Sequence, residues 1–215
     1  MRHPNRHSEN ERYEMARTIV KTLNKSTRTS TVAFGQENLP KDCGYMIYPN
    51  HQGKYDVLGI VLTHPEPCTF VMDEDRSHMP LLIEIMMLLE AKVLKLDDLR
   101  QNLRLFQEMK DEVTTRGRKF ILFSEGGYKE NNKNVMESFK PGSFKVAQMA
   151  KCPIIPVALI DSYKVYNSPE KGPFKTYVYY LEPIYYDEYK DMKTREISAL
   201  VEQRISEKIK EHQKV

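Results

Sequence analysis

Short apolar runs alternate along this chain with segments whose apolar residues recur at helical spacing. The runs expected to form strands are 44–48, 68–72, 92–96, 119–123, 154–160 and 176–181. The segments expected to form helices are 57–62, 80–89, 99–115, 144–150 and 194–212. Consecutive parallel strands need a long crossover, usually a helix, whereas antiparallel strands need only a tight turn. The alternation therefore predicts an α/β fold, with a mostly parallel central sheet flanked by helices.

An amphipathic helix is predicted ahead of the first strand, over residues 10–24. Tyr13, Ala16 and Val20 recur there at helical spacing. Residues 1–30 carry seven Arg or Lys and three Glu, whereas the whole chain of 215 residues has a net charge of only +3. We expect residues 1–30 to form a basic N-terminal helix that contacts anionic phospholipids at a membrane surface. A basic helix face that is simply exposed to water is an equal alternative.

The bulk properties of the chain limit the classes of protein to which it can belong. A net charge of +3 does not suit a basic nucleic-acid binder, so no nucleic-acid partner is expected. The N-terminus lacks the apolar core of a signal peptide, and no run approaches the ~18 apolar residues that span a bilayer. Three cysteines without a C-x-x-C spacing indicate a reducing compartment and no zinc site. We expect a cytoplasmic protein that binds no metal.

Two polar motifs stand at the ends of predicted strands. Asn50 and His51 follow the run 44–48, and residues 124–127 follow the run 119–123. The carboxyl ends of parallel strands share one edge of the sheet, where ligands of α/β proteins collect. Glycines after a strand also let backbone N–H groups approach a ligand closely. We therefore expect the two motifs to meet in one cleft.

His51 and Asp56 are the candidate catalytic pair. An imidazole held by a carboxylate is the usual general base, because the carboxylate fixes its tautomer and stabilises the imidazolium. Two residues form a weak motif, and a surface His followed by an unrelated Asp is the commoner meaning of such a pair. The chain has no G-x-S-x-G elbow for a serine nucleophile. A His–Asp pair without a nucleophile suits direct transfer, in which a deprotonated hydroxyl attacks an activated acyl group.

Four elements follow one another in an order that is more specific than any of them alone. They are an N-H-x4-D pattern at Asn50, His51 and Asp56, a Phe-Ser-Glu-Gly run at 123–126, a Phe-Lys-Pro-Gly run at 139–142, and a proline-framed apolar strand at 153–157. By these elements, which span roughly residues 38–165, the chain resembles the PlsC-type glycerolipid acyltransferases, the 1-acyl-sn-glycerol-3-phosphate acyltransferase family. Residues 31–215 are then expected to form the acyltransferase domain.

The resemblance implies transfer of a fatty acyl chain from a thioester, acyl-ACP or acyl-CoA, to the sn-2 hydroxyl of lysophosphatidate, which gives phosphatidate. It implies no cofactor beyond this donor, and we expect the protein to lie peripherally on the inner face of the membrane. By the same resemblance His51 is the base and Asp56 its partner. The residues implied in substrate binding are Asn50, Arg100, Glu125, Gly126, Gly127 and Lys140.

The chain departs from the family pattern at two points. Ser124 stands where the third family motif, F-P-E-G, has a proline, although Glu125 and Gly126 are kept. The second point is the cation for the acceptor's phosphate. The second family motif ends in an Arg, and here Asp97 and Asp98 stand at the matching place. A phosphate needs a cation to hold it. Arg100 follows closely and is the first candidate, with Lys95 and Lys140 as the others.

Other functions remain open on the sequence alone. The same machinery can acylate another acceptor, such as glycerol 3-phosphate or a lysophospholipid. Water in place of the hydroxyl would make the protein an acyl-thioester hydrolase, and loss of the chemistry would leave a lipid-binding protein. The apolar segment 81–89, which contains two Met, fits either an adaptable wall for an acyl chain or an ordinary core helix.

Overall fold

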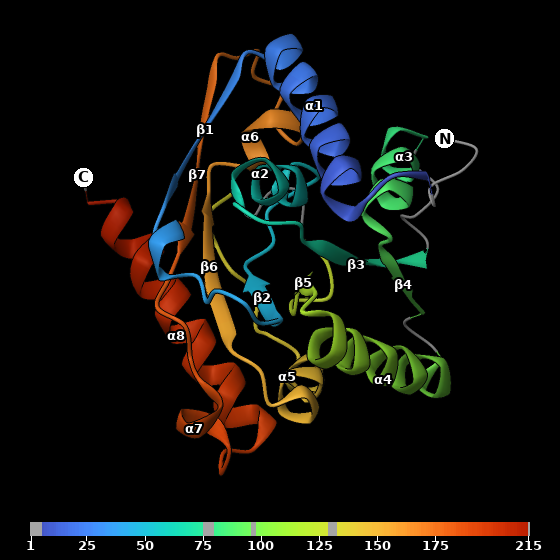
Figure 1. Ribbon diagram of the computed structural model, residues 1–215. Helices are drawn as coiled ribbons and strands as arrows, with labels where there is room; N and C mark the ends of the chain where they lie inside the picture. Colours follow the sequence, from blue (N-terminus) through green and yellow to red (C-terminus); the bar gives the residue numbers. More distant parts are fainter. Residues whose placement is uncertain (1–5, 75–79, 96–97, 129–132, 215) are drawn as a thin grey trace.

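A seven-stranded sheet forms the centre of the molecule (Figure 1). The computed structural model describes residues 6–74, 80–95, 98–128 and 133–214. In spatial order the strands are β1 (Thr29–Phe34), β7 (Phe174–Tyr180), β6 (Ile154–Ile160), β2 (Tyr45–Pro49), β5 (Lys119–Ile121), β3 (Thr69–Asp73) and β4 (Lys92–Leu94). The strands from β6 to β4 run parallel, β7 is antiparallel to β6, and β1 is parallel to β7. The predicted α/β fold with a mostly parallel sheet is confirmed.

Helices cover both faces of the sheet, so the fold has three layers (Figure 1). One face carries α1 (Glu9–Thr27), α2 (Asp56–Thr63), α3 (Pro80–Leu89) and α6 (Tyr163–Tyr166). The other face carries α4 (Leu99–Arg116), α5 (Lys145–Ala150), α7 (Tyr186–Tyr189) and α8 (Thr194–His212). Two 3-10 helices, η2 (Gln36–Asn38) and η4 (Pro141–Phe144), lie in the connections. An apolar core fills each of the two interfaces between sheet and helices.

Side chains of the central strands alternate between these two cores. In β2, Tyr45 and Ile47 enter the core beneath α1, α2 and α3. Met46 and Tyr48 enter the core beneath α4, α5 and α8. Because successive side chains of a strand point to opposite faces, a strand covered on both sides needs a continuous apolar run. The sequence pattern around residues 44–48 has this physical cause.

Most element boundaries expected from the sequence agree with the structure. The helices expected at 80–89 and 194–212 are α3 and α8, with the same bounds. The strand expected at 119–123 is shorter, since β5 ends at Ile121. Nothing in the sequence predicts β1, because its side chains are only partly buried and no continuous apolar run marks it. The strand expected over residues 92–96 is β4, which ends at Leu94. Residue 96 itself lies outside the described residues.

The N-terminal helix α1 is one of the packed layers of the fold. The hydroxyl of Ser8 accepts the N–H of Glu11, and the Glu11 carboxylate accepts the N–H of Ser8, so a capping box starts the helix. Its inner face is fully buried at Ala16 and Val20. The amphipathic helix predicted over 10–24 is confirmed.

Part of the basic character of α1 is used inside the protein. Arg12 is 6% exposed, and its guanidinium donates to a backbone carbonyl of α3 and pairs with Glu90 at 2.8 Å. Arg17 donates to a backbone carbonyl of α2. Lys21 and Lys25 are exposed. The membrane contact expected of the N-terminal segment stays a prediction, and two of its cations are now assigned to packing.

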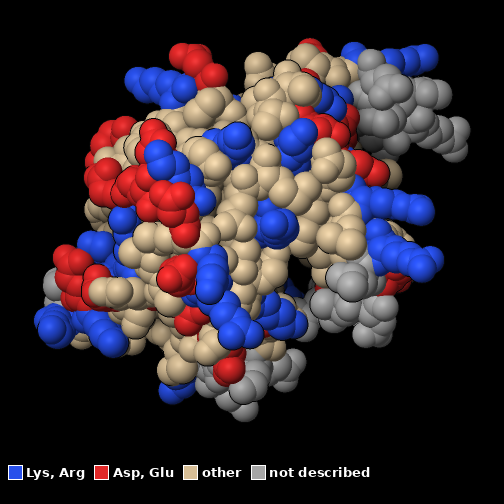
Figure 2. Space-filling model, turned by 90° about the horizontal axis from the view of Figure 1, so that it is seen from below, with Lys and Arg blue, Asp and Glu red and all other residues tan. Residues whose placement is uncertain are grey.

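Acidic and basic side chains are mixed on the face that carries α4, α5 and α8. Figure 2 looks onto the molecule from below the view of Figure 1 and shows Lys and Arg beside Asp and Glu over much of this face. On α4, Lys110 pairs with Asp111 at 2.9 Å, and on α8, Lys208 pairs with Glu211 at 2.5 Å. Charges of both signs are therefore interspersed here, as on an ordinary solvated surface.

A buried arginine joins four elements near the end of α3. The side chain of Arg118, just before β5, is 3% exposed. Its guanidinium pairs with Glu90 after α3 at 2.8 Å, with Glu112 of α4 at 3.0 Å and with Glu9 of α1 at 3.3 Å. The charges and hydrogen bonds of these three carboxylates offset the cost of removing the guanidinium from water.

Replacing Arg118 with Ala should lower the free energy of unfolding by about 3–5 kcal/mol, because the neighbouring carboxylates lose their buried cation. Urea unfolding followed by circular dichroism measures this loss. Arg116→Ala is the matched control, since the side chain of Arg116 is 52% exposed and lies 3.9 Å from Glu90. The control should lose no more than about 1 kcal/mol. Equal losses in the two variants would contradict a special role for the buried cation.

Candidate active site

Loops that follow neighbouring strands meet at the carboxyl edge of the sheet. β6, β2 and β5 lie side by side, and residues 161–162, 50–53 and 124–127 follow them. The backbone N–H of His51 donates to Glu125 Oε1 at 2.7 Å, so the loops after β2 and β5 are in direct contact. The two polar motifs expected to share a cleft do so.

His51 and Asp56 are in contact. His51 Nδ1 lies 2.7 Å from Asp56 Oδ2. α2 begins at Asp56, and the loop before it folds back so that the imidazole meets the first turn of the helix. A carboxylate only accepts hydrogen bonds, so Nδ1 carries the proton and donates, and Nε2 is left as an acceptor. In this tautomer the imidazole can take a proton from a hydroxyl group.

The carboxylate of Asp56 is fully buried and hydrogen-bonded on both oxygens. Besides the His51 imidazole, Oδ2 accepts the backbone N–H groups of Gln52 at 2.6 Å and Gly53 at 3.0 Å. Oδ1 accepts the hydroxyl of Ser162 at 2.5 Å. These donors offset the cost of burying a charge. They also hold the carboxylate in one position, which fixes the direction in which it orients the imidazole.

Aromatic rings enclose the imidazole of His51. Its centroid lies 4.2 Å from that of Phe123 and 4.7 Å from that of Tyr128, which meets it edge-on. The His51 side chain is 14% exposed. The ring is therefore confined on two sides and by its carboxylate, and little of its surface remains for a ligand to reach.

The amide of Asn50 fastens the loop after β2 to β6. Its Nδ2 donates to the carbonyl of Leu159 at 3.0 Å, and its Oδ1 accepts the N–H of Leu159 at 2.7 Å. Asn50 is 1% exposed, and both ends of its amide are used. The substrate-binding role expected for Asn50 stays a prediction; its visible role is to position His51, the next residue.

Glu125 links the loop after β5 to two other segments. Its Oε1 accepts the N–H of His51, and its Oε2 accepts the N–H of Glu137 at 2.9 Å. Burial is the main cause that raises the pKa of Glu125 to about 7; the two N–H donors oppose the rise and the charge of Asp56 adds to it. The carboxyl group therefore holds the loops together while its protonation changes near neutral pH.

Gly126 lets the side chain of Lys140 cross the loop. Its φ is +74°, and a Cβ at this position would lie 2.2 Å from Lys140 Nζ. Only glycine accepts both the conformation and the close approach. Lys140 is exposed at the start of η4, and its ammonium makes no ion pair with any described residue. An ammonium group without an ion pair among the described residues thus lies directly beside the glycine loop.

An apolar groove of about 640 Å³ opens beside His51. Its lining from α1, α2 and α3 is Leu23, Val57, Leu58, Leu82 and Ile85, and from the strand ends Val71, Met72, Leu94, Leu122 and Phe123. Gly126 and Gly127 lie on the same wall. The groove has the chemistry to hold an alkyl chain with one end at the imidazole. In the segment 81–89, Leu88 and Leu89 belong to the core, as expected of a core helix, and Leu82 and Ile85 line the groove. The expected role of the segment as a wall for an acyl chain stays a prediction.

The three candidate cations for a phosphate lie in different places. Arg100 is exposed on the first turn of α4 and does not line the groove. Lys95 pairs with Glu74 at 2.9 Å. Lys140 lies against Gly126, which does line the groove. Of the three, Lys140 is the cation that the fold brings to the site.

Gln52 and Ser162 belong to the site, although nothing in the sequence analysis singles them out. The hydroxyl of Ser162 lies 2.8 Å from Gln52 Oε1 as well as 2.5 Å from Asp56. Gln52 Nε2 donates to Asn134 at 2.7 Å. The one available signal for Ser162 was its position after β6, at the edge where the other motifs stand. A serine after a strand is too common to be noticed without the strand order.

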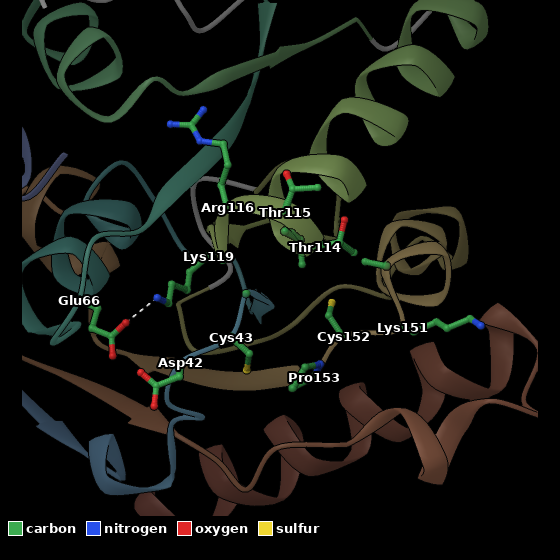
Figure 3. Close-up of a pocket in the computed structure, with 14 residues that line it drawn as sticks. Asp42, Cys43, Glu66, Thr114, Thr115, Arg116, Lys119, Lys151, Cys152 and Pro153 are labelled. Carbon is green, nitrogen blue, oxygen red and sulfur yellow. Dashed lines mark hydrogen bonds and ion pairs between the residues drawn. The ribbon is translucent and has the colours of Figure 1, made fainter. Parts of the chain in front are cut away.

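A second cavity, of about 740 Å³, lies at the opposite edge of the sheet, where β2, β5 and β6 begin (Figure 3). Lys119 and Glu66 form an ion pair on its wall. Cys43 and Cys152 both line it but pack into opposite cores. No His lines this cavity, and the described residues contain no cluster of His, Cys, Asp and Glu suited to a metal ion. The groove beside His51 is therefore the candidate active site.

Comparison with known proteins identifies the family to which this chain belongs. The family model named acyltransferase matches residues 31–160. The matched stretch includes His51, Asp56 and the loop after β5. The chain belongs to the acyltransferase family.

Several relatives of this chain are named as 1-acyl-sn-glycerol-3-phosphate acyltransferases. The 1-acyl-sn-glycerol-3-phosphate acyltransferase of Saccharomyces cerevisiae is 28% identical over 140 residues, which are 65% of this chain and 46% of that protein. The chain spans about half the length of the curated relatives it matches. The crystal structure of PlsC, the 1-acyl-sn-glycerophosphate acyltransferase of Thermotoga maritima, matches with a TM-score of 0.75 at 22% identity, over 94% of this chain and 79% of that one. This likeness concerns the fold.

Helices of the described residues are all too short or too polar to cross a bilayer.

The raised pKa of Glu125 predicts a pH dependence of stability. Between its ordinary value of 4.5 and about 7, the folded protein keeps a proton that the unfolded chain releases. Stability should therefore fall as pH rises through this window, by a contribution on the order of 3 kcal/mol, and level off above it. Thermal unfolding at pH 5, 6, 7 and 8 of the wild type and of Glu125→Gln measures the difference. Glu207→Gln, at an exposed position of α8, is the control. A wild-type profile that Glu125→Gln leaves unchanged would contradict the prediction.

Proposed function

We propose that this protein transfers a fatty acyl chain from a thioester, acyl-ACP or acyl-CoA, to the sn-2 hydroxyl of lysophosphatidate, forming phosphatidate. The observation that carries the proposal is the acceptor Nε2 of His51 beside an apolar groove, with Nδ1 held by the buried Asp56. The groove suits the acyl chain, and the imidazole suits the hydroxyl. The named relatives support the choice of lysophosphatidate among possible acceptors.

His51 acts as the general base in this proposal. Its Nε2 takes the proton of the acceptor hydroxyl as the oxygen attacks the thioester carbonyl, which gives a tetrahedral intermediate. The C–S bond then breaks, and the thiolate leaving group takes the proton back from the imidazolium. Asp56 stabilises the positive imidazolium while it exists, because its carboxylate lies 2.7 Å from Nδ1. No side chain is acylated, and no metal or other cofactor takes part.

Lys140 holds the acceptor's phosphate in this proposal, in place of Arg100. Its ammonium lies over Gly126 and has no described carboxylate partner, so a phosphate there gains a charge-assisted hydrogen bond without breaking an existing pair. Gly126 and Gly127 carry no side chains of their own, which lets a headgroup held by Lys140 approach their backbone closely. Glu125 and Asn50 position the loops around this site through their backbone bonds.

The cytoplasmic face of a membrane is the proposed place of action. Lysophosphatidate and phosphatidate are amphiphiles that reside in a lipid layer, and the three cysteines of the chain are unpaired, as in a reducing compartment. The enzyme would work there as a peripheral protein.

Incubation with a radiolabelled acyl thioester and separate acceptors tests the proposal directly. Lysophosphatidate should give labelled phosphatidate, with both acyl-ACP and acyl-CoA offered as donors. Glycerol 3-phosphate and lysophosphatidylcholine test the alternative acceptors. Release of free fatty acid without any acylated lipid would contradict transfer and indicate a hydrolase. No turnover of any thioester would indicate a lipid-binding protein.

Asp56→Asn should lower the rate of transfer by about 10²–10⁴-fold, because an amide no longer stabilises the imidazolium or fixes its tautomer. His51→Ala should abolish transfer. Steady-state rates at saturating donor measure both effects, and circular dichroism checks that each variant is folded. Asp187→Asn, at a side chain that is 88% exposed, is the matched control. A rate close to that of the wild type in Asp56→Asn would show that the pair takes no part in the chemistry.

Lys140→Ala should raise the KM for lysophosphatidate by at least about tenfold, because a hydrogen bond to a charged group is lost. The KM for the acyl donor should change little. Arg100→Ala is the comparison, and its KM for lysophosphatidate should stay within about twofold of the wild type. The reverse result, with the larger rise in KM in Arg100→Ala, would indicate that Arg100 binds the phosphate.

A further inference from the structure

A strained turn after β6 holds Ser162 in one position. Asp161 has a φ of +64°, a left-handed conformation that residues other than glycine rarely adopt. The side chain of Asn134 fastens this turn, because its Oδ1 accepts the N–H of Asp161 at 2.9 Å and its Nδ2 donates to Asp161 Oδ1 at 3.0 Å. Strain of this kind persists only where the surrounding structure fixes it, and it is concentrated at functional sites. The turn brings the hydroxyl of Ser162 to Asp56 at the start of α2.

The amide of Gln52 fixes the backbone of Ser162. Asn134 Oδ1 accepts the N–H of Asp161, so it is the acceptor end of that amide, and Gln52 Nε2 donates to it at 2.7 Å. Gln52 Oε1 therefore faces Ser162, where it accepts the N–H at 3.1 Å and lies 2.8 Å from the hydroxyl. Ser162 is 3% exposed, so its hydroxyl is directed by these neighbours and hardly by water.

The hydroxyl proton of Ser162 has two acceptors within reach and can serve one of them. Gln52 Oε1 is neutral, whereas Asp56 Oδ1 is charged and closer, at 2.5 Å. A hydrogen bond to an ionised acceptor is about twice as strong as one between neutral groups, so the proton is directed to Asp56. Within the described part of the chain, Ser162 is the donor to Oδ1, while His51 and two backbone N–H groups serve Oδ2.

We propose that Ser162 is a positioning residue of the acyl transfer, whose hydroxyl keeps the His51 imidazole neutral and able to accept a proton in the resting enzyme. This inference rests on the proposed function, in which His51 is the base. While the imidazole is neutral, the charge of Asp56 is not balanced, and a donor on Oδ1 stabilises that state strongly. Once the imidazole is protonated, it balances the carboxylate, and the same hydroxyl contributes less. The hydroxyl therefore favours the neutral imidazole, which is the form that acts as a base.

Other titratable groups around the imidazole stay in place when Ser162 alone is changed. Glu125 accepts the backbone N–H of His51 at 2.7 Å, and the ring of Tyr128 lies against the imidazole. The remaining groups are the ion pair of Asp161 with Lys164 behind Ser162, Lys140 against Gly126, and Lys54, Asp73 and Tyr166 on the groove wall. Each of them acts on the imidazole in the wild type and in a Ser162 variant alike. A difference between the two proteins therefore reports the hydroxyl.

An NMR titration of the full chain without substrates measures the effect directly. The imidazole signals of His51, identified by their absence in His51→Ala, are followed from pH 5 to pH 9. In Ser162→Ala the midpoint should lie about one pH unit higher than in the wild type, because part of a hydrogen bond to a charged group is lost. Ser162→Thr, which keeps the hydroxyl, should titrate as the wild type does. An unchanged or lower midpoint in Ser162→Ala would overturn the proposal.

A control variant and a second substitution accompany this titration. Ser198→Ala on α8 is the matched control, since Ser198 is 2% exposed and its hydroxyl lies 3.1 Å from the carboxylate of Glu202. It should leave the His51 midpoint unchanged. If circular dichroism shows that Ser162→Ala does not fold, Ser162→Cys takes its place, because a thiol has a similar size but is a weak donor. A folded Ser162→Cys variant with the wild-type midpoint would equally overturn the proposal.

The pH dependence of transfer gives the second measurement. At pH 6, kcat/KM of Ser162→Ala should be about tenfold below that of the wild type, because deprotonation of His51 needs about one more pH unit. At pH 9 the two values should agree within about twofold. A loss of equal size at both pH values would indicate a structural role of Ser162 and overturn the proposal. Absence of transfer by the wild type would overturn the proposed function alone, and the NMR titration would still decide the role of Ser162.

Discussion

The buried carboxylate of Asp56 is the interaction on which the site depends. A fully buried charge requires donors around it, and here these come from the His51 imidazole, from the backbone of the loop after β2, and from the hydroxyl of Ser162 after β6. Each donor is thereby tied to one point at the start of α2. The direction of the imidazole is a consequence of this arrangement and does not depend on the substrate.

The order of the strands brings together the loops that surround Asp56. β2 lies between β6 and β5, so the loops after all three strands end at the same edge of the sheet. Asn50 fastens the β2 loop to β6, and Glu125 fastens it to the loop after β5. The loop after β2, which carries His51, is therefore held from both neighbouring strands by side chains whose bonds run to backbone atoms. Such a loop is preorganised, which in the proposed reaction lowers the cost of bringing His51 and the acceptor hydroxyl together.

The apolar groove arises from the same packing that stabilises the fold. α3 contributes Leu88 and Leu89 to the core and Leu82 and Ile85 to the groove, so one helix separates protein interior from ligand space. Arg118 anchors the end of this helix to α1, α4 and β5 through buried ion pairs. The position of the groove's wall thus depends on charges far from the imidazole.

The sequence by itself predicted the fold class and the candidate site residues His51, Asp56, Glu125 and Gly126, because the periodicity of apolar residues and the order of the motifs can be read from the linear sequence. It missed β1, whose partial burial leaves no apolar run, and it missed Ser162, because a serine after a strand carries no signal. Only the tertiary structure shows that Lys140 lies beside Gly126 whereas Arg100 does not line the groove, since both stand close to a motif in sequence and only the path of the chain brings one of them to the site. It likewise turned Arg12 and Arg17 inward and left Ile83 and Met87 of α3 exposed, because burial depends on neighbouring elements that a linear pattern does not contain.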